Sequence, residues 1–183
     1  MSPVDSRDDS SYARPTSHMS AASVTISDAH DSDSDEVTDL IRSVYAEYPD
    51  CILDVHGEEP ELLRVGTSFR EKGGRFWVAR SENGIVGTIA YFPLPAATWE
   101  LKKLYVHRSA RRLGVASRLM DMAESLAQAS EVRKLVLWTD TRFVEAQAFY
   151  RARGFEPTGE QRDWGDVSNT TAVEYVKLLP RSL

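Results

Sequence analysis

The chain has 183 residues, 42% hydrophobic and 27% charged, which suffices for one domain with a buried core. Its net charge of -6 argues against general nucleic-acid binding, and its single cysteine, Cys51, excludes an internal disulfide and a cysteine metal cluster. No apolar run could span a bilayer and no apolar signal core is evident, so we expect a cytoplasmic protein without membrane contact.

Residues 1–22 are rich in Ser, Asp, Arg and Pro and offer little to bury. We therefore predict a disordered tail there, followed by a single domain over residues 23–183. The domain is expected to begin with a strand at Ser23–Ile26. An acidic run at Asp31–Glu36 then favours a helix start, and Pro49 ends that helix. The apolar residues of this helix fall on one face: Val37, Leu40, Ile41, Val44 and Tyr45.

The connection Tyr48–Glu59 stands out for its acidic content. It leads to a second helix, which begins at Pro60 and which Gly73-Gly74 stops. The acidic residues in and beside the connection are Glu47, Asp50, Asp54, Glu58, Glu59 and Glu61. A solvated connection is one interpretation; if the residues line a pocket instead, they favour a cationic ligand.

A β-hairpin is predicted next. The dipeptide Asn83-Gly84 is a strong hairpin signal and would join Phe76–Arg80 to Ile85–Phe92 as an antiparallel pair. Pro93 and Pro95 are expected to break the second strand.

The stretch around Gly114 reads as a strand, a basic turn and the start of a helix. The strand covers Trp99–Val106, and a helical repeat follows at Val115, Leu119, Met122 and Leu126. A glycine at a helix N-terminus, with arginines beside it, suits an anion such as a phosphate. A solvated basic turn before an ordinary amphipathic helix is the alternative.

The C-terminal part alternates between strands and one helix. Lys134–Trp138 is nearly all apolar, as in a buried strand, and Phe143–Arg153 reads as a helix that Gly154 ends. Two final strands are expected at Phe155–Gln161 and Thr171–Leu178. The order of elements predicts a mixed α/β fold with a mainly antiparallel central sheet flanked by helices.

Two motifs in this order resemble the GNAT family of N-acetyltransferases. The first fits Arg/Gln-x-x-Gly-x-Gly/Ala, the family's acyl-CoA pyrophosphate signature, at Arg111, Gly114 and Ala116. The second fits Ala-x-x-x-Tyr-x-x-x-Gly-Phe, at Ala146, Tyr150, Gly154 and Phe155. The resemblance covers roughly Val24 to Leu179 and implies the acyl-CoA N-acyltransferase fold.

The resemblance implies transfer of an acyl group, usually acetyl from acetyl-CoA, to an amine by direct attack in a ternary complex. No ligand spacing for a metal is evident in the sequence, so we expect no metal, and we expect a monomer or homodimer. The pantetheine arm would contact the backbone of Leu104, Tyr105 and Val106. The pyrophosphate would be wrapped by Arg111, Arg112, Leu113, Gly114, Val115, Ala116 and Ser117. A catalytically silent acyl-CoA-binding or interaction module is the alternative function.

Two catalytic roles follow from the same resemblance. Glu100 is similar to the glutamate that the histone-acetylating branch carries at this offset before the motif, so it is the expected base. Its alternative is a strand carboxylate paired with Lys102 or Lys103. Tyr150 is the expected acid for the departing thiolate; its alternative is a core tyrosine.

The chain departs from the family pattern at two positions. Phe143 stands where many members carry Asn, which removes one polar contact to the cofactor arm, and Arg112 replaces a frequent Gly in the turn. The acceptor remains open between small amines, polyamines and peptides, and the acidic connection favours a cationic one.

Overall fold

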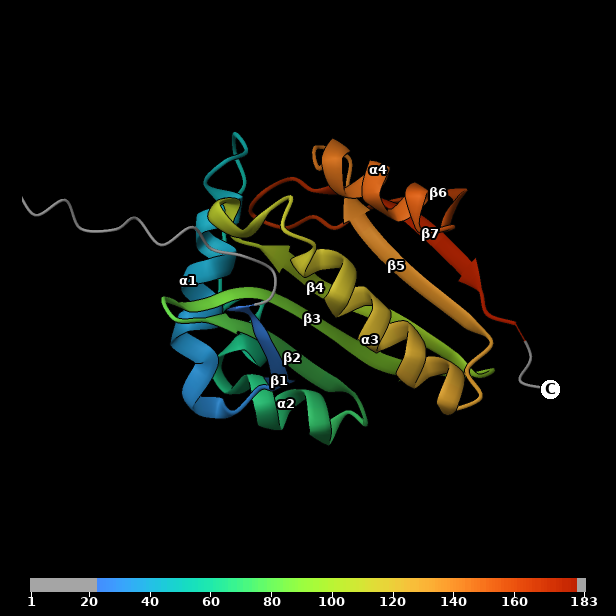
Figure 1. Ribbon diagram of the computed structural model, residues 1–183. Coiled ribbons are helices and arrows are strands. Elements are labelled where there is room, and N and C mark those ends of the chain that lie inside the picture. Colours follow the sequence, from blue (N-terminus) through green and yellow to red (C-terminus); the bar gives the residue numbers. More distant parts are fainter. Residues whose placement is uncertain (1–22, 181–183) are drawn as a thin grey trace, which may run out of the picture.

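A seven-stranded sheet runs through residues 23–180, the part of the chain that the computed structural model describes (Figure 1). The predicted disordered tail of residues 1–22 lies outside the described residues, as do residues 181–183. The strands are β1 (Thr25–Asp28), β2 (Arg75–Ser81), β3 (Gly84–Leu94), β4 (Thr98–Val106), β5 (Lys134–Asp140), β6 (Glu156–Asp163) and β7 (Thr171–Leu178). Their order is β1-β2-β3-β4-β5-β7-β6. Only the β4–β5 pair within this sheet is parallel, so the predicted mainly antiparallel mixed fold is confirmed.

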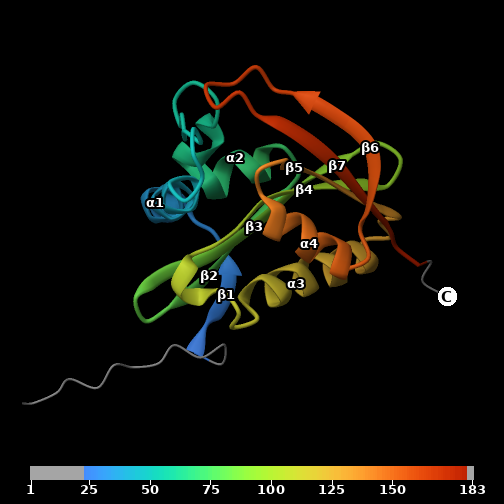
Figure 2. The same cartoon turned by 90° about the horizontal axis from the view of Figure 1, so that it is seen from above.

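Helices cover both faces of the sheet. They are α1 (Ser34–Tyr45), α2 (Val65–Glu71), α3 (Val115–Ala129) and α4 (Val144–Ala152), with the short 3-10 turns η2 (Asp31–Asp33), η3 (Pro60–Arg64) and η4 (Arg108–Ala110). Helices α1 and α2 lie on one face, and α3 and α4 lie on the other (Figure 2). Each face has its own apolar core, one around Val37, Leu62 and Phe69 and the other around Leu119 and Tyr150.

Local signals in the sequence explain most element ends. The predicted hairpin is present, but its two turn residues are Glu82 and Asn83, because Ser81 pairs with Gly84, the first residue of β3. Helix α4 ends in a Schellman motif: Gly154 takes φ 81°, its N–H donates to the Arg151 carbonyl, and the Phe155 N–H donates to the Tyr150 carbonyl.

Several predicted boundaries were wrong. Helix α1 ends at Tyr45, before Pro49, and the segment from Pro60 is a 3-10 helix as far as Arg64, so that α2 begins only at Val65. Strand β1 begins at Thr25 and not at Ser23. Strand β3 does not break at Pro93, which pairs with Trp99, but continues to Leu94. Proline is tolerated there because β2 pairs with β3 only as far as Tyr91, so one side of the strand has no strand partner beyond that residue.

The middle of the sheet splits at a β-bulge in β4. Thr88 pairs with Tyr105 but Ala90 pairs with Lys102, so β4 carries one extra residue opposite β3. Lys103 takes φ 56°, and its carbonyl accepts a 2.7 Å hydrogen bond from the Thr88 hydroxyl.

Beyond the bulge, β4 leaves its parallel partner. The β4–β5 register runs from Thr98↔Lys134 to Leu101↔Leu137 and ends there, and Figure 1 shows the two strands diverging. The backbone of β4 after Leu101 therefore has no strand partner on its β5 side.

Candidate active site

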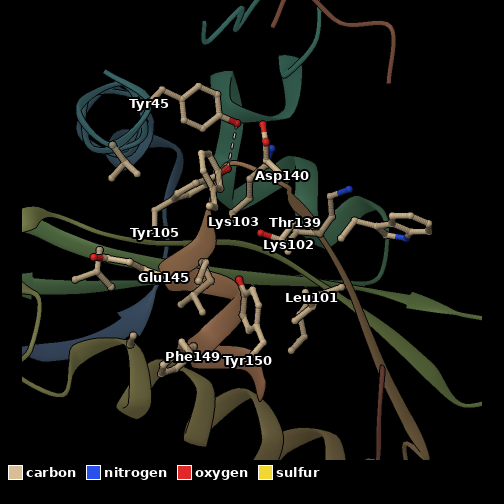
Figure 3. A pocket seen from close by; sticks show the side chains of 18 of the residues that line it. Tyr45, Leu101, Lys102, Lys103, Tyr105, Thr139, Asp140, Glu145, Phe149 and Tyr150 are labelled. Atoms are coloured by element: carbon tan, nitrogen blue, oxygen red, sulfur yellow. Dashed lines mark hydrogen bonds between the residues drawn. The ribbon is translucent and has the colours of Figure 1, made fainter. Parts of the chain in front are cut away.

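A cavity of about 960 Å³ occupies the split between β4 and β5 (Figure 3). Its lining comes from β4, the turn before α3, the first turn of α3, the end of β5, and α4. The C-terminal end of α1, the segment after it and the loop between β6 and β7 complete the wall. This volume lies within the range of small-molecule and cofactor sites.

One end of the cavity is the N-terminus of α3. Gly114 is the N-cap, with φ 78° and no side-chain cap, so the amides of the first turn have no intrahelical acceptor. A Cβ at Gly114 would meet nothing within 4 Å, so the backbone faces open space. Arg108 and Arg112 also line this end. Free amides, the helix dipole and two guanidinium groups together make an anion site.

Arg112 holds its place in this turn at a conformational cost. Its φ of 63° lies in the left-handed region, where the family often has glycine and where a side chain costs about 1–2 kcal/mol. The turn therefore keeps the glycine-like backbone path although the glycine is replaced.

The Arg111 side chain is engaged with the protein itself. Its guanidinium donates to both carboxylate oxygens of Glu47, at 2.6 and 2.8 Å, and to the Val106 carbonyl at 3.1 Å. Arg111 thus ties the end of α1 to the turn, and the free groups at this end are backbone amides and the other two arginines. Leu113 is the one predicted pyrophosphate residue that does not line the cavity.

The three predicted pantetheine residues, Leu104, Tyr105 and Val106, all line the cavity on the unpaired part of β4. The Tyr105 ring turns toward α1, and its hydroxyl lies 3.1 Å from that of Tyr45 (Figure 3). Burial raises the pKa of Tyr45 to about 12 and that of Tyr105 well above its ordinary value, so both hydroxyls stay protonated at neutral pH.

Tyr150 is both a core residue and a cavity residue. Only 7% of it is exposed, and its ring packs against Phe155 and Tyr175 with centroids 6.0 and 6.2 Å apart. Its hydroxyl points into the cavity (Figure 3). Burial raises the pKa of Tyr150 well above its ordinary value, so the hydroxyl keeps its proton and can donate it.

Glu100 and Lys102 lie on β4 where the split begins, and both line the cavity. The Lys102 Nζ lies 3.4 Å from Glu100 Oε1. Of the two lysines considered as ion-pair partners for Glu100, Lys102 therefore makes the contact. The Lys102 side chain is 27% exposed and the Glu100 side chain is 20% exposed. A carboxylate thus stands beside the split with an amine next to it.

Lys103 pairs with other carboxylates. The bulge turns its side chain toward η3, where the ammonium contacts Glu59 and, at 3.6 Å, Glu61. Burial raises the pKa of Glu59. Burial is also the largest single influence on Glu61 and opposes its ionisation, but the charge of Lys103 and hydrogen bonds to the Glu61 carboxylate together lower the pKa of that carboxyl.

Half of the six acidic residues singled out in the sequence line the cavity: Glu58, Glu59 and Glu61. Glu47 is bound to Arg111, Asp54 accepts a 2.8 Å hydrogen bond from the Gly57 N–H, and Asp50 is exposed. Two further acids, Asp140 from β5 and Asp166 from the β6–β7 loop, also line the cavity. The sequence carried no signal for them, because strand pairing alone brings them here. We call the part of the cavity that these five acids line its acidic end.

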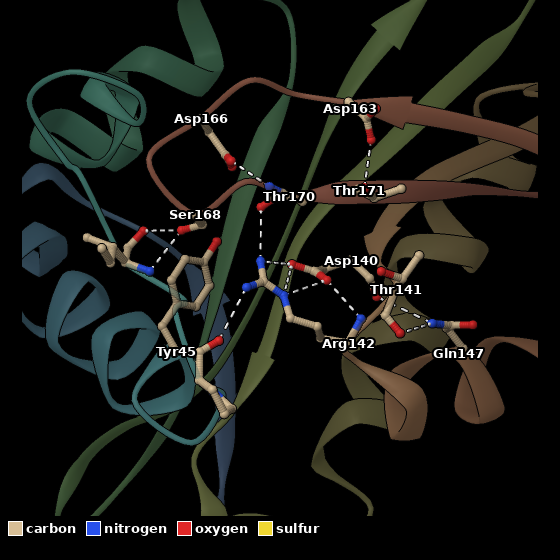
Figure 4. Close-up of polar contacts among 12 residues, drawn as sticks. Tyr45, Asp140, Thr141, Arg142, Gln147, Asp163, Asp166, Ser168, Thr170 and Thr171 are labelled. Carbon is tan, nitrogen blue, oxygen red and sulfur yellow. Dashed lines mark hydrogen bonds and ion pairs between the residues drawn. The ribbon is translucent and has the colours of Figure 1, made fainter.

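The acidic end is closed by contacts between distant segments (Figure 4). The Ser168 hydroxyl accepts from the Ile52 N–H at 2.8 Å and donates to the Ile52 carbonyl at 3.1 Å, across 116 residues of sequence. The Val167 N–H donates to Glu58 at 2.7 Å.

Arg142 adds a second set of ties at this end. It bonds both Asp140 oxygens, the Pro49 carbonyl at 3.3 Å and the Thr170 hydroxyl at 3.3 Å. The Ser168 and Glu58 contacts join residues 50–58 to the loop of residues 164–170, and we call this pair of segments the clasp. Arg142 ties the same loop to the adjoining Pro49.

Two general features of the described residues bear on the chemistry. Between residues 23 and 180, no cluster of three or more His, Cys, Asp or Glu side chains could hold a metal ion. In the same range, no helix has the length and apolar content needed to cross a membrane.

Comparison with solved structures finds the same architecture elsewhere. An acetyltransferase of the GNAT family from Staphylococcus aureus Mu50 superimposes with a TM-score of 0.73 at 25% identity, over 86% of this chain and 99% of that one. A phosphinothricin acetyltransferase from Sinorhizobium meliloti, solved in complex with AcCoA, superimposes with a TM-score of 0.67 at 18% identity, over 86% and 89%.

Sequence comparison gives relatives and the family. Human N-acetyltransferase 8 is 30% identical over 151 residues, which cover 78% of this chain and 64% of that protein. Human N-acetyltransferase 8B is 29% identical over 60% of this chain and 52% of its own length, so the chain spans between half and two thirds of these relatives. Residues 37–155 match the model of the acetyltransferase (GNAT) family, and the chain therefore belongs to that family.

Proposed function

We propose that the protein transfers an acetyl group from acetyl-CoA to an amine, by direct attack within a ternary complex. The observation that carries this proposal is the continuity of one cavity from the uncapped N-terminus of α3 to the split between β4 and β5. The first suits a pyrophosphate, and the second offers an unpaired strand edge along which an extended pantetheine arm fits. The relatives' names and the AcCoA complex of one structural neighbour support the choice of donor.

Different groups in the cavity are proposed to carry the separate steps of acetyl transfer. An amine is mostly protonated at neutral pH and must lose a proton before it attacks. In the proposal Glu100 accepts that proton, and a β4 amide beyond Leu101 stabilises charge on the thioester oxygen. Tyr150, whose protonated hydroxyl points into the cavity, donates a proton to the departing thiolate.

The distribution of charge favours a cationic acceptor. The arginines that line the cavity gather at the α3 end, at Arg108, Arg111 and Arg112. Five of the acids that line the cavity, Glu58, Glu59, Glu61, Asp140 and Asp166, lie at the clasp end, where they outnumber Lys102, Lys103 and the Asp140-bound Arg142. Glu100 and Glu145 line the cavity as well. The anionic donor and a cationic acceptor would thus be drawn to opposite ends.

The test is a turnover screen. Release of coenzyme A thiol from acetyl-CoA is measured with monoamines, diamines, polyamines and peptides, and we expect turnover with at least one amine that carries a second positive charge. Thermal stabilisation by acetyl-CoA, with no amine-dependent release across the screen, would instead identify a silent acyl-CoA-binding module.

A further inference from the structure

Two neighbouring lysines of this chain, Lys102 and Lys103, line the end of the cavity where the acceptor amine is proposed to bind. The chain has five lysines, and Lys102 and Lys103 are the two that line this cavity. Their side chains differ in accessibility, at 27% exposed for Lys102 and 6% for Lys103. The same cavity is the proposed site of acetyl transfer, so an amine here is a potential acceptor.

Lys102 stands where the acetyl group is proposed to lie. It is the first residue of β4 after the last parallel pair, Leu101↔Leu137, and so sits at the apex of the split. It lies two residues from Glu100 on the same strand face, and its Nζ is 3.4 Å from the Glu100 carboxylate. The amine is therefore next to the group assigned to remove an ammonium proton.

Lys103 is held in a way that keeps it unreactive. Its ammonium is shared by Glu59 and Glu61, and its side chain is nearly inaccessible. With its ammonium held between two carboxylates and its side chain buried, Lys103 is not free to approach a thioester in the split. We therefore expect Lys102 to be able to accept an acetyl group and Lys103 not to.

We propose that Lys102 is a self-acetylation site, an inference that rests on the proposed acetyl transfer. Glu100 accepts one proton from the Lys102 ammonium, and the Nζ lone pair forms a bond to the acetyl carbonyl carbon. The carbon–sulfur bond breaks, and Tyr150 protonates the departing thiolate. The amine's second proton restores the Tyr150 hydroxyl, and Glu100 releases the first to solvent. The products are Nε-acetyl-Lys102 and coenzyme A, with no oxidation or reduction.

The experiment incubates the full chain with acetyl-CoA in the absence of any added amine and follows acetylation by mass spectrometry. Fragment spectra separate Lys102 from Lys103 and from the exposed Lys72 and Lys134, which report purely chemical acetylation. We expect Lys102 to be modified about a hundredfold faster than Lys134, the lower range of general acid–base catalysis. Excess coenzyme A should suppress modification at Lys102 and leave that at Lys134 unchanged.

Variants and dilution complete the test. Lys102→Arg should remove the modification, Lys134→Arg should leave it unchanged, and Glu100→Gln should slow it. The first-order rate should not depend on protein concentration, because donor site and acceptor lie in one chain. The inference is overturned if Lys102 reacts no faster than Lys134, or if Lys103 is modified in its place, in a preparation that turns over an added amine. If the protein neither binds acetyl-CoA nor acetylates any amine, it is the proposed function that fails.

Discussion

At the scale of the residue, Tyr150 reconciles the two roles considered for it. Its ring belongs to the core on the α3–α4 face while its hydroxyl faces the cavity. Packing on Phe155 and Tyr175 fixes the ring, so the hydroxyl is held in place before any substrate binds. The burial that anchors the ring also keeps the proton on the oxygen.

The first prediction tests this proton. Tyr150→Phe keeps the ring and removes the hydroxyl, so kcat should fall by a factor of about a hundred or more while the Kd for acetyl-CoA stays within twofold, roughly. Stopped-flow or steady-state release of coenzyme A measures the rate, and calorimetry measures the affinity. Tyr175→Phe is the matched control: it removes a neighbouring buried hydroxyl, which bonds Gln147 at 3.3 Å, outside the cavity. Equal rates for the two variants would remove Tyr150 as the acid.

The Tyr45–Tyr105 pair leads to a second prediction, on stability at alkaline pH. The pKa of Tyr45 is about 12 in the folded protein against an ordinary value of 10.0. Since the folded value is the higher one, the unfolded chain loses this proton first, so stability is unaffected below pH 10 and falls as the pH rises toward 12. The fall is on the order of 3 kcal/mol.

Tyr45→Phe removes that titration and one hydrogen bond. We expect it to lower the free energy of unfolding at neutral pH by about 1 kcal/mol and to flatten the fall above pH 10. Denaturant unfolding at a series of pH values measures both. Parallel curves for the parent and the variant would contradict the assignment.

At the scale of the element, the sequence predicts what local patterns control. Helices α1, α3 and α4 and the hairpin at Asn83-Gly84 were all predicted, because each depends on a periodicity or turn of a few residues. The bulge at Lys103 could not be predicted, because it arises from a one-residue mismatch between β4 and β3. The split between β4 and β5, and hence the cavity, depends on where that pairing stops.

The third prediction concerns the N-terminus of α3. Gly114→Ala should destabilise the fold by about 1–2 kcal/mol, because φ 78° strains an L side chain although open space surrounds the new Cβ. It should also raise the Kd for acetyl-CoA about tenfold, because the methyl group projects where the phosphates approach the amides.

Gly159→Ala in β6 is the matched control for this variant. Gly159 also has positive φ, at 88°, and open space around its Cβ, but it lies outside the cavity. Similar loss of stability with unchanged affinity is expected. If both variants bind acetyl-CoA equally well, the anion site is not at the start of α3.

At the scale of the whole molecule, the acceptor end is assembled from segments that lie far apart in the sequence. Residues 50–58 follow α1, and residues 164–170 connect the last two strands, yet Ser168 and Glu58 join them in the clasp, and Arg142 bonds the adjoining Pro49 and Thr170. The family resemblance predicted the donor end from two compact motifs. The acceptor end has no such motif, because single hydrogen bonds between distant loops define it, and these vary without changing the fold.

The fourth prediction tests whether the clasp shapes acceptor binding. Ser168 is 5% exposed and bonds both backbone groups of Ile52, so Ser168→Ala removes two hydrogen bonds and leaves the Ile52 groups without them. A loss of about 1–3 kcal/mol in local stability follows. Amide hydrogen exchange should quicken in residues 50–58 and 164–170, and the KM for the best amine should rise about tenfold. The Kd for acetyl-CoA should not change, because the donor end lies at α3.

Thr171→Ala, which removes an exposed 2.6 Å bond to Asp163 in the same hairpin, is the control. Faster exchange with an unchanged KM would show that the clasp stabilises the loops without selecting the acceptor.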